Sequence, residues 1–418
     1  MLKKIAVSQL RLGMHVHALD GPWLNHPFWR TKFVIADPAD LQRLVDSSVS
    51  ECWINPQLGL DVPATLAAQP KAAPPAASEN PEKTAELLTA PPELRNASKS
   101  LQEELQQAAA ICNRGRAAVV SMFNEARMGK TVDSEGCLPL VAEIADSVER
   151  NPGALVSLAR LKTRHDYSYM HSVAVCALMV SMGRQMGMGE EQRRQAGLAG
   201  LMHDIGKAVM PVAVLDKPGS LTDVEFSVMR SHPRRGHDIL VEGRGATVEM
   251  LDVVLHHHER VDGTGYPEKI SGDAFTQIAR MGAICDVYDA ITSNRPYKRG
   301  WDPAESIARM AGWKGHLDPV LFGVFVRSLG IYPTGSLVRM ASSRLAVVVE
   351  QNASSLVSPI VKVFFSTKSD MPIAPVLLDL SRSDCTDRIV GREQGADERF
   401  PNLVDVWIDP TALRRAQG

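Results

Sequence analysis

A proline-rich stretch divides this chain of 418 residues, because it cannot form part of a hydrophobic core. Residues 61–92 hold seven of the 26 prolines, and alanine, serine and lysine fill much of the remainder. Such a composition buries little apolar surface and predicts a flexible, partly extended linker. The chain must therefore fold in separate parts, and we expect a multidomain protein.

The linker is preceded by residues 1–60, which predict a small N-terminal α+β domain. One helix is expected from Pro38 to Asp46, with Asp37 as its cap and proline in its first turn. Short apolar or alternating runs predict the strands, which are Ile5–Val7, Val16–Leu19, Phe33–Ile35 and Cys52–Ile54.

The pattern becomes helical after the linker. In residues 93–149, Leu101, Leu105, Ala108/Ala109 and Cys112 recur on one face at steps of three and four. This helical connector fits a linking helix and a dimerising helix equally well, so a homodimer is one expectation. Residues 150–330 show no strand alternation of any length and predict an all-α domain. The helices expected there are Met170–Met186, Glu190–Ile205, Thr222–Ser231, Val248–His258, Phe275–Ser293 and Pro303–Gly312.

The sequence pattern changes again in residues 331–418, which predict a small β-rich extension. Runs of β-branched and apolar residues are separated there by turn residues, which is typical of a β-meander. The expected strands are Ser336–Arg339, Leu345–Val349, Ile360–Phe365 and Val376–Leu380.

Composition narrows the classes of function. A net charge of −2 gives no general attraction to nucleic-acid polymers or anionic membranes, so a phosphate site must be local. The six cysteines form no CxxC pair, which argues against a thiolate zinc site and against a disulfide framework. No apolar run approaches the roughly 18 residues that cross a bilayer. We therefore expect a cytoplasmic protein.

Histidine marks the region of interest, because eight of the twelve histidines fall between residues 165 and 258. His203 and Asp204 close an apolar helix and are followed by Gly206 and Lys207. Adjacent imidazole and carboxylate groups can reach one metal ion or two neighbouring ions. We expect Gly206 to end the helix and to let Lys207 point at a bound anion. The other His-Asp pairs carry weaker signals, and we interpret His237-Asp238 as a surface pair.

A second motif runs from His256 through His257 and His258 to Pro267. Three consecutive histidines at the end of a helix point about 100° apart, so two of them could serve two metal ions. The loop that follows, Asp262–Pro267, is expected to be rigid because it combines two glycines with a proline. Core packing does not explain three clustered imidazoles.

Further candidates are single residues. His171, His232 and Asp286 each fit an ordinary cap, helix terminus or solvated carboxylate when taken alone. Together with the two motifs they give a set of only imidazoles and carboxylates, which suits Fe or Mn and also Zn. A cationic set surrounds them, in which a proline turn could aim Arg295 and Lys298 at a phosphate. Its members are Lys207, Lys217, Arg230, Arg260, Arg295, Lys298 and Arg299.

These motifs resemble the HD-GYP signature, over residues 150–330 of the chain. The matching residues are His203-Asp204 with Gly206-Lys207, His257-His258-Glu259 with Asp262-Gly263, Gly265-Tyr266-Pro267, Asp286–Ala290 and Arg295–Lys298. Residues 13–28 also resemble a small uncharacterised domain often found ahead of HD-GYP modules.

The resemblance implies a metal-dependent phosphodiesterase. Its metal ligands would be His171, His203, Asp204, His232, His257, His258 and Asp286, and His256 would lie outside the set. Asp204 and a solvent hydroxide would bridge the ions, and Lys207 would contact the scissile phosphate. Tyr266, Arg295 and Lys298 would help to hold the substrate. Some relatives hold a third metal through a glutamate where this chain has Tyr167, so we expect two divalent ions, with Fe or Mn favoured.

The expected reaction is hydrolysis of cyclic di-GMP to pGpG, with slow further conversion to GMP. Two alternatives stay open from the residues alone. One is another hydrolase of the HD superfamily, acting on a nucleotide or on a different cyclic dinucleotide. The other is a non-catalytic module that recruits a signalling partner such as a diguanylate cyclase.

Overall fold

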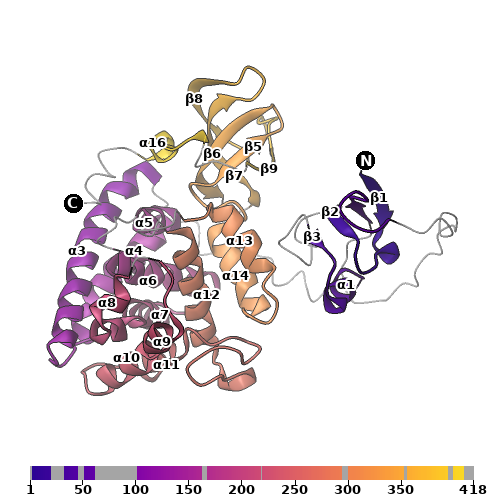
Figure 1. Ribbon diagram of the computed structural model, residues 1–418. Coiled ribbons are helices and arrows are strands. Elements are labelled where there is room, and N and C mark those ends of the chain that lie inside the picture. Colours follow the sequence, from indigo (N-terminus) through magenta and orange to yellow (C-terminus); the bar gives the residue numbers. More distant parts are fainter. Residues whose placement is uncertain are drawn as a thin grey trace. The chain divides into compact units, whose positions relative to one another are not determined.

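The computed structural model describes residues 2–19, 33–45, 51–61, 101–161, 167–217, 219–293, 300–352, 355–393 and 399–408. The predicted linker lies almost wholly outside these residues. The chain divides into two compact units, of which the first holds an N-terminal sheet and the second a helical core with a C-terminal sheet (Figure 1). No helix among the described residues has both the length and the apolar character needed to span a bilayer.

The N-terminal sheet is antiparallel with strand order β1-β4-β2-β3. Its strands and single α-helix are β1 (Lys3–Ala6), β2 (His15–Leu19), β3 (Phe33–Val34), α1 (Pro38–Val45) and β4 (Glu51–Ile54). Val16, Ile35, Leu44 and Ile54 are fully buried and form its core. All four predicted strands are present, with their ends shifted by one or two residues.

The second unit is mostly helical. Its first helices are α3 (Leu101–Arg127), η6 (Glu135–Cys137), α4 (Leu138–Arg150), α5 (Pro152–Arg160), α6 (Tyr167–Gln185), α7 (Glu190–Met202), η7 (Ile205–Val209) and α8 (Val212–Leu215). The next are α9 (Asp223–Met229), α10 (His232–Val241), α11 (Val248–His256), η8 (Gly272–Ala274), α12 (Gln277–Thr292), α13 (Pro303–Ala311) and α14 (Pro319–Leu329).

Two helix boundaries in this core differ from the prediction. The helix predicted over Thr222–Ser231 does end before Pro233, at Met229, but a further helix that was not among those predicted, α10, begins at His232 and has Pro233 in its first turn. Proline is tolerated there because the first backbone N–H groups of a helix have no intrahelical partner. The helix expected to run to Ile205 ends at Met202, and a separate 3₁₀ turn, η7, follows.

Glycines let the helices that carry the motifs approach closely. A Cβ atom at Gly200 in α7 would lie 3.0 Å from the carbonyl oxygen of Val175 in α6. A Cβ atom at Gly282 in α12 would lie 2.8 Å from Cγ1 of Val253 in α11. Both distances are shorter than ordinary contacts, so these pairs of helices pack backbone against side chain.

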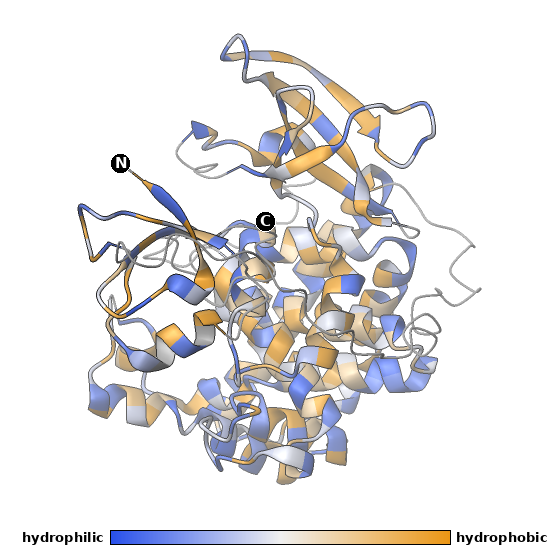
Figure 2. Ribbon diagram, turned by 90° about the vertical axis from the view of Figure 1, so that its right-hand side faces the viewer, coloured by the Kyte–Doolittle hydropathy of each residue, from blue (hydrophilic) through white to orange (hydrophobic). Residues whose placement is uncertain are grey.

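The C-terminal sheet has strand order β8-β7-β6-β5-β9 and is antiparallel. Its elements are β5 (Leu337–Met340), β6 (Arg344–Asn352), β7 (Ser355–Ser366), β8 (Met371–Asp379), β9 (Ile389–Arg392) and α16 (Val404–Trp407). Figure 2 shows how strongly hydrophobic residues dominate its strands. The predicted meander covers β5 to β8, whereas β9 returns to pair with β5, which the sequence pattern did not indicate.

Candidate metal centre

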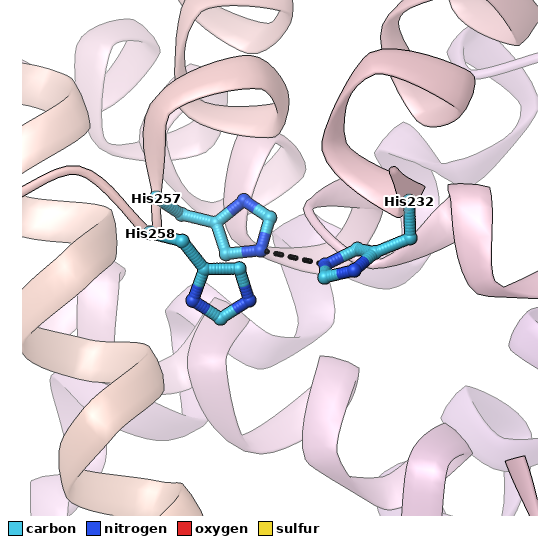
Figure 3. A group of neighbouring side chains, drawn as sticks. All are labelled: His232, His257 and His258. Atoms are coloured by element: carbon cyan, nitrogen blue, oxygen red, sulfur yellow. Dashed lines mark hydrogen bonds between the residues drawn. The ribbon is translucent and has the colours of Figure 1, made fainter. Parts of the chain in front are cut away.

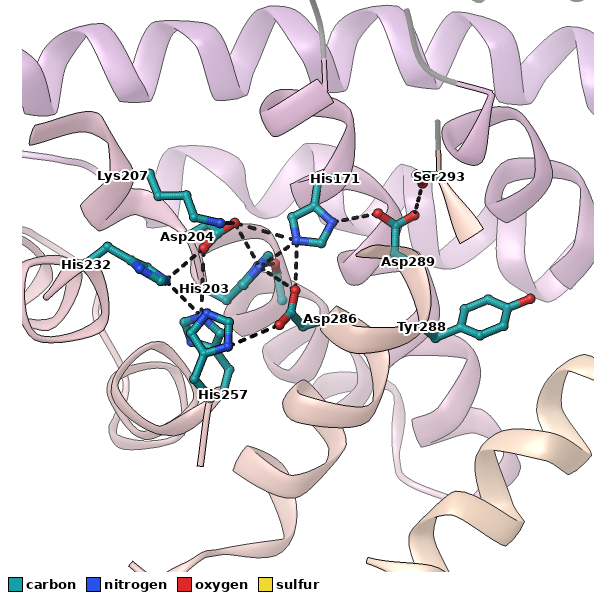
Figure 4. Close-up of polar contacts among 12 residues, drawn as sticks. His171, His203, Asp204, Lys207, His232, His257, Asp286, Tyr288, Asp289 and Ser293 are labelled. Atoms are coloured by element: carbon teal, nitrogen blue, oxygen red, sulfur yellow. Dashed lines mark hydrogen bonds and ion pairs between the residues drawn. The ribbon is translucent and has the colours of Figure 1, made fainter. Parts of the chain in front are cut away.

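Five segments of the helical core bring imidazole and carboxylate groups to one buried place (Figure 4). α6 supplies His171, the turn after α7 supplies His203 and Asp204, and α12 supplies Asp286. His232 opens α10, and His257 and His258 directly follow α11. The structure thus brings together all seven residues that the resemblance implied as ligands.

Backbone carbonyl groups fix the orientation of three imidazole rings. Nδ1 of His203 lies 2.8 Å from the carbonyl oxygen of Gly200, and Nδ1 of His232 lies 2.8 Å from that of Met229. Nδ1 of His257 lies 3.0 Å from the carbonyl oxygen of Val254. A carbonyl oxygen only accepts, so each Nδ1 carries the hydrogen and donates it. In the neutral ring, Nε2 therefore carries a lone pair, which is directed into the centre.

These lone pairs face one another. Nε2 of His232 lies 3.2 Å from Nε2 of His257 (Figure 3), and Nε2 of His203 lies 3.2 Å from Nε2 of His171. Burial lowers the pKa of His232 and His257, and it lowers the pKa of His258 to about 3. Neutral imidazoles with converging lone pairs form a stable arrangement when a cation lies among them.

Asp204 lies between two pairs of imidazoles. Its Oδ1 atom is 3.2 Å from Nε2 of His232 and 3.7 Å from Nε2 of His257. Its Oδ2 atom is 3.3 Å from Nε2 of His203 and 3.6 Å from Nε2 of His171. Oδ1 is buried and has no hydrogen-bond partner in the described part of the chain. An unpartnered buried carboxylate oxygen is costly unless it binds a cation.

The carboxylates stay charged in spite of their burial. Burial opposes ionisation of Asp204, but Lys207 and the imidazoles outweigh it and hold the pKa of Asp204 well below its usual range. Burial likewise opposes ionisation of Asp286, but its contacts with His171 and the nearby imidazoles outweigh burial and hold the pKa of Asp286 well below its usual range. Nζ of Lys207 lies 2.5 Å from Oδ2 of Asp204. Lys207 therefore lies at the edge of the centre, where it was expected.

Two groups of three side chains have the spacing that a metal ion requires. One consists of His171, His203 and Asp286, and the other of His232, His257 and His258. Within each group the potential ligand atoms lie within 4.8 Å of one another. His203, Asp204 and His257 form a third such group that connects the other two. The donor set fits a pair of divalent ions that share Asp204.

The loop after α11 is anchored by a buried carboxylate. Oε1 of Glu259 accepts hydrogen bonds from the backbone N–H groups of Glu268 at 2.6 Å and Lys269 at 2.8 Å. Gly265 lies so close that a Cβ atom there would be 2.4 Å from Cα of Glu259. The anchored loop stacks the ring of Tyr266 on that of His258, with ring centroids 4.7 Å apart.

The other predicted residues have different positions. Arg295, Lys298 and Arg299 lie outside the described residues, as does the side chain of Tyr167. Nζ of Lys217 lies 2.5 Å from Oε2 of Glu225, next to the Thr222 cap of α9. The charge of Lys217 is therefore already paired in a structural contact. His237 and Asp238 form a partly exposed pair 3.6 Å apart and belong to none of the groups of potential metal ligands among the described residues.

Asp289 is a functional candidate to which the sequence reasoning gave no role. Its Oδ2 atom accepts a hydrogen bond of 2.6 Å from Nδ1 of His171, and its Oδ1 atom accepts one from Ser293. A carboxylate behind a metal-binding imidazole fixes its tautomer and raises its basicity. Asp286 and Asp289 lie one turn apart on α12, and this spacing could have indicated from the sequence that both face the same site.

Comparison with known proteins identifies the family. A family model described as "HD domain" matches residues 144–321, and one described as "Domain of unknown function (DUF3391)" matches residues 2–137. A protein of Pseudomonas aeruginosa named as a cyclic di-GMP phosphodiesterase is 51% identical over 419 residues, covering 100% of this chain and 98% of the relative. This chain belongs to the HD-GYP family.

Two further relatives each match less than half of this chain. A cyclic di-GMP phosphodiesterase response regulator of Xanthomonas campestris is 36% identical over 43% of this chain and 48% of its own length. A 3′3′-cGAMP-specific phosphodiesterase of Vibrio cholerae is 34% identical over 40% of this chain and 38% of its own length. The uncharacterised N-terminal domain expected from the sequence is confirmed, and its match continues past the predicted linker into α3.

Proposed function

We propose that this HD-GYP protein hydrolyses cyclic di-GMP at a centre of two divalent transition-metal ions. Its likeness to the Pseudomonas aeruginosa phosphodiesterase extends over the whole chain and supports the reaction. The observation that carries the proposal is the carboxylate of Asp204, which has an unpartnered Oδ1 atom and lies among four converging imidazole nitrogens.

The ligand assignment follows from the two groups of side chains. His171, His203 and Asp286 would hold one ion, His232, His257 and His258 the other, and Asp204 would contribute one oxygen to each. Imidazole and carboxylate ligands favour Fe or Mn, although Zn also accepts them. Cys285 adjoins Asp286, but burial raises its pKa far above the usual value, so it stays a thiol and offers no soft ligand.

A pair of divalent cations supplies a hydroxide nucleophile at neutral pH and neutralises charge on the phosphoryl oxygens. The chain's own groups then orient the substrate. Lys207 adds a positive charge beside Asp204, where negative charge develops on the scissile phosphate. Tyr266, Arg295 and Lys298 would hold the dinucleotide. The oxygen of one water forms a bond to phosphorus, the bond from phosphorus to the 3′ oxygen breaks, and that oxygen takes up a proton to leave as a hydroxyl group, which yields linear pGpG. A second, slower hydrolysis of the remaining diester would give two molecules of GMP.

Several broader features belong to the same proposal. We expect the layout to comprise the N-terminal domain, residues 1–60, the linker, residues 61–92, the connector, residues 93–149, the catalytic domain, residues 150–330, and the extension, residues 331–418. A cytoplasmic location, a homodimer and a diguanylate cyclase partner stay predictions.

Product analysis tests the reaction. Protein purified without oxygen and loaded with Fe²⁺ or Mn²⁺ should convert cyclic di-GMP to pGpG, as followed by chromatography. The double variant His203→Ala/Asp204→Ala should lose turnover by at least about 1,000-fold, because both groups of ligands lose a member. The matched control is His237→Ala/Asp238→Ala, which removes the partly exposed pair and should keep full turnover.

A substrate panel separates the alternatives. The likeness to a 3′3′-cGAMP-specific relative makes other cyclic dinucleotides the first competitors. Turnover confined to 3′3′-cGAMP, or to deoxynucleoside triphosphates, would reject cyclic di-GMP as the substrate. If fully metal-loaded wild-type protein is inert toward the whole panel, the chain acts as a binding module.

A further inference from the structure

Arg230 is a further cation beside the metal centre. It directly follows α9 and precedes the proposed ligand His232 by two residues. Its guanidinium carbon lies 4.7 Å from the ring centroid of Tyr266 and 5.8 Å from that of Phe226. Among the described residues, no carboxylate lies within ion-pair distance of this half-buried side chain.

Three nearby cations do have acidic partners. Lys207 is paired with Asp204, Lys217 with Glu225, and Arg234 with Glu268. Arg230 is thus a cation whose charge is balanced by no acidic side chain among the described residues. A partly desolvated charge of this kind is stabilised when an anion binds beside it.

One aromatic ring connects Arg230 to the centre. The ring of Tyr266 stacks on His258 with an interplanar angle of 30° and contacts the Arg230 guanidinium as well. The face of the Tyr266 ring attracts the Arg230 guanidinium as a cation–π partner. When the face of a guanidinium lies against a ring, its edge N–H groups remain free to donate in parallel.

We propose that Arg230 binds the second, non-scissile phosphate of the cyclic dinucleotide. This inference rests on the proposed function and deepens it. A cyclic dinucleotide carries two phosphodiesters, and Lys207 with the proposed ions serves the one that is cleaved. The other must also be matched by positive charge, and the planar fork of an arginine fits two phosphate oxygens at once.

The test compares a substrate that carries a second phosphate with one that lacks it. Arg230→Ala and Arg230→Lys are assayed in Mn²⁺-loaded, full-length protein with cyclic di-GMP and with bis(p-nitrophenyl) phosphate. For cyclic di-GMP, Arg230→Ala should raise KM about 10- to 100-fold, because a charged hydrogen-bonding pair is lost. Arg230→Lys should fall between Arg230→Ala and wild type. With bis(p-nitrophenyl) phosphate both variants should match wild type. The control is Arg235→Ala, an exposed arginine on α10.

Inhibition separates phosphate binding from base recognition. Cyclic di-GMP and cyclic di-AMP share their phosphates and differ in their bases, and each competes with bis(p-nitrophenyl) phosphate. Arg230→Ala should weaken inhibition by both cyclic dinucleotides by the same factor. A loss confined to cyclic di-GMP would assign Arg230 to guanine and overturn the proposal, as would an unchanged KM in Arg230→Ala. If wild-type protein cleaves bis(p-nitrophenyl) phosphate but not cyclic di-GMP, the proposed function itself fails.

Discussion

At the scale of residues, backbone carbonyl oxygens decide which imidazole nitrogen faces the centre. His203, His232 and His257 each donate from Nδ1 to a carbonyl in the preceding turn. The helices therefore set the tautomer before any ion binds, and Nε2 is left as the ligand atom. His171 differs because a carboxylate, Asp289, accepts its Nδ1 hydrogen.

Asp289 is expected to act as a positioning residue. Asp289→Asn removes the negative charge behind His171, so the metal affinity should fall about 10- to 100-fold. The affinity is measured by titrating Mn²⁺ into metal-free protein and counting bound ions. Asp273→Asn, at an exposed position in η8, is the matched control and should bind as wild type does. Unchanged affinity in Asp289→Asn would mean that the charge has no role in holding His171.

Sequence reasoning recovered the centre but not its support. His203-Asp204 and His257-His258 are adjacent along the chain and lie in two compact motifs, so the sequence marked them as candidates. The contact between His171 and Asp289 joins residues 118 positions apart, and only the packing of α6 against α12 creates it. The sequence also could not predict which cations are exposed and which are paired with a carboxylate. Lys217 and Arg230 were therefore given the same interpretation.

At the scale of elements, close backbone contacts place the ligands. A Cβ atom at Gly206 would lie 1.9 Å from the carbonyl oxygen of His232, so η7 touches the first residue of α10, a proposed ligand. The sequence predicted that Gly206 would end a helix, but α7 ends earlier, at Met202, and Gly206 lies inside η7. The contact with α10 could not be foreseen, because α10 was not among the predicted helices. Helical periodicity found most elements and misplaced their ends.

The C-terminal sheet offers a test of pH dependence away from the centre. Asp387 accepts hydrogen bonds from Ser342 at 2.6 Å and from Arg344 at 2.9 Å. Partial burial opposes its charge, but the bonds from Ser342 and Arg344 outweigh this and lower the pKa of Asp387. A depressed carboxyl pKa contributes stability above the unfolded value of about 3.9, and this contribution is lost as the pH falls through the folded value.

Asp387→Asn should therefore lower the free energy of unfolding by about 1 kcal/mol at pH 7. The difference from wild type should shrink as the pH falls below about 4, where wild-type Asp387 becomes protonated. Urea unfolding of both proteins at pH 7 and at low pH measures this difference in the free energy of unfolding. The control, Asp384→Asn, disrupts the exposed pair with Arg382 and should leave stability unchanged. A difference between Asp387→Asn and wild type that does not change with pH would contradict this assignment.

At the scale of the whole molecule, the centre connects elements that are distant along the chain. Its ligands come from α6, the turn after α7, α10, the end of α11 and α12, so bound ions would cross-link most of the helical core. The broad division into a helical core with strand-containing regions at each end followed from composition and periodicity. The return of β9 beside β5 did not, because a short strand that pairs far along the chain leaves little local pattern.

The most direct measurement is a titration of metal-free protein with Mn²⁺, in which bound ions per chain and hydrolysis of cyclic di-GMP are followed together. Two ions should bind per chain, and hydrolysis should reach its maximum only when the second is bound, since Asp204 joins both groups of ligands. Asp204→Ala should bind fewer than two ions and stay inactive. Full activity with a single bound ion, or no saturable binding at all, would contradict the two-metal centre.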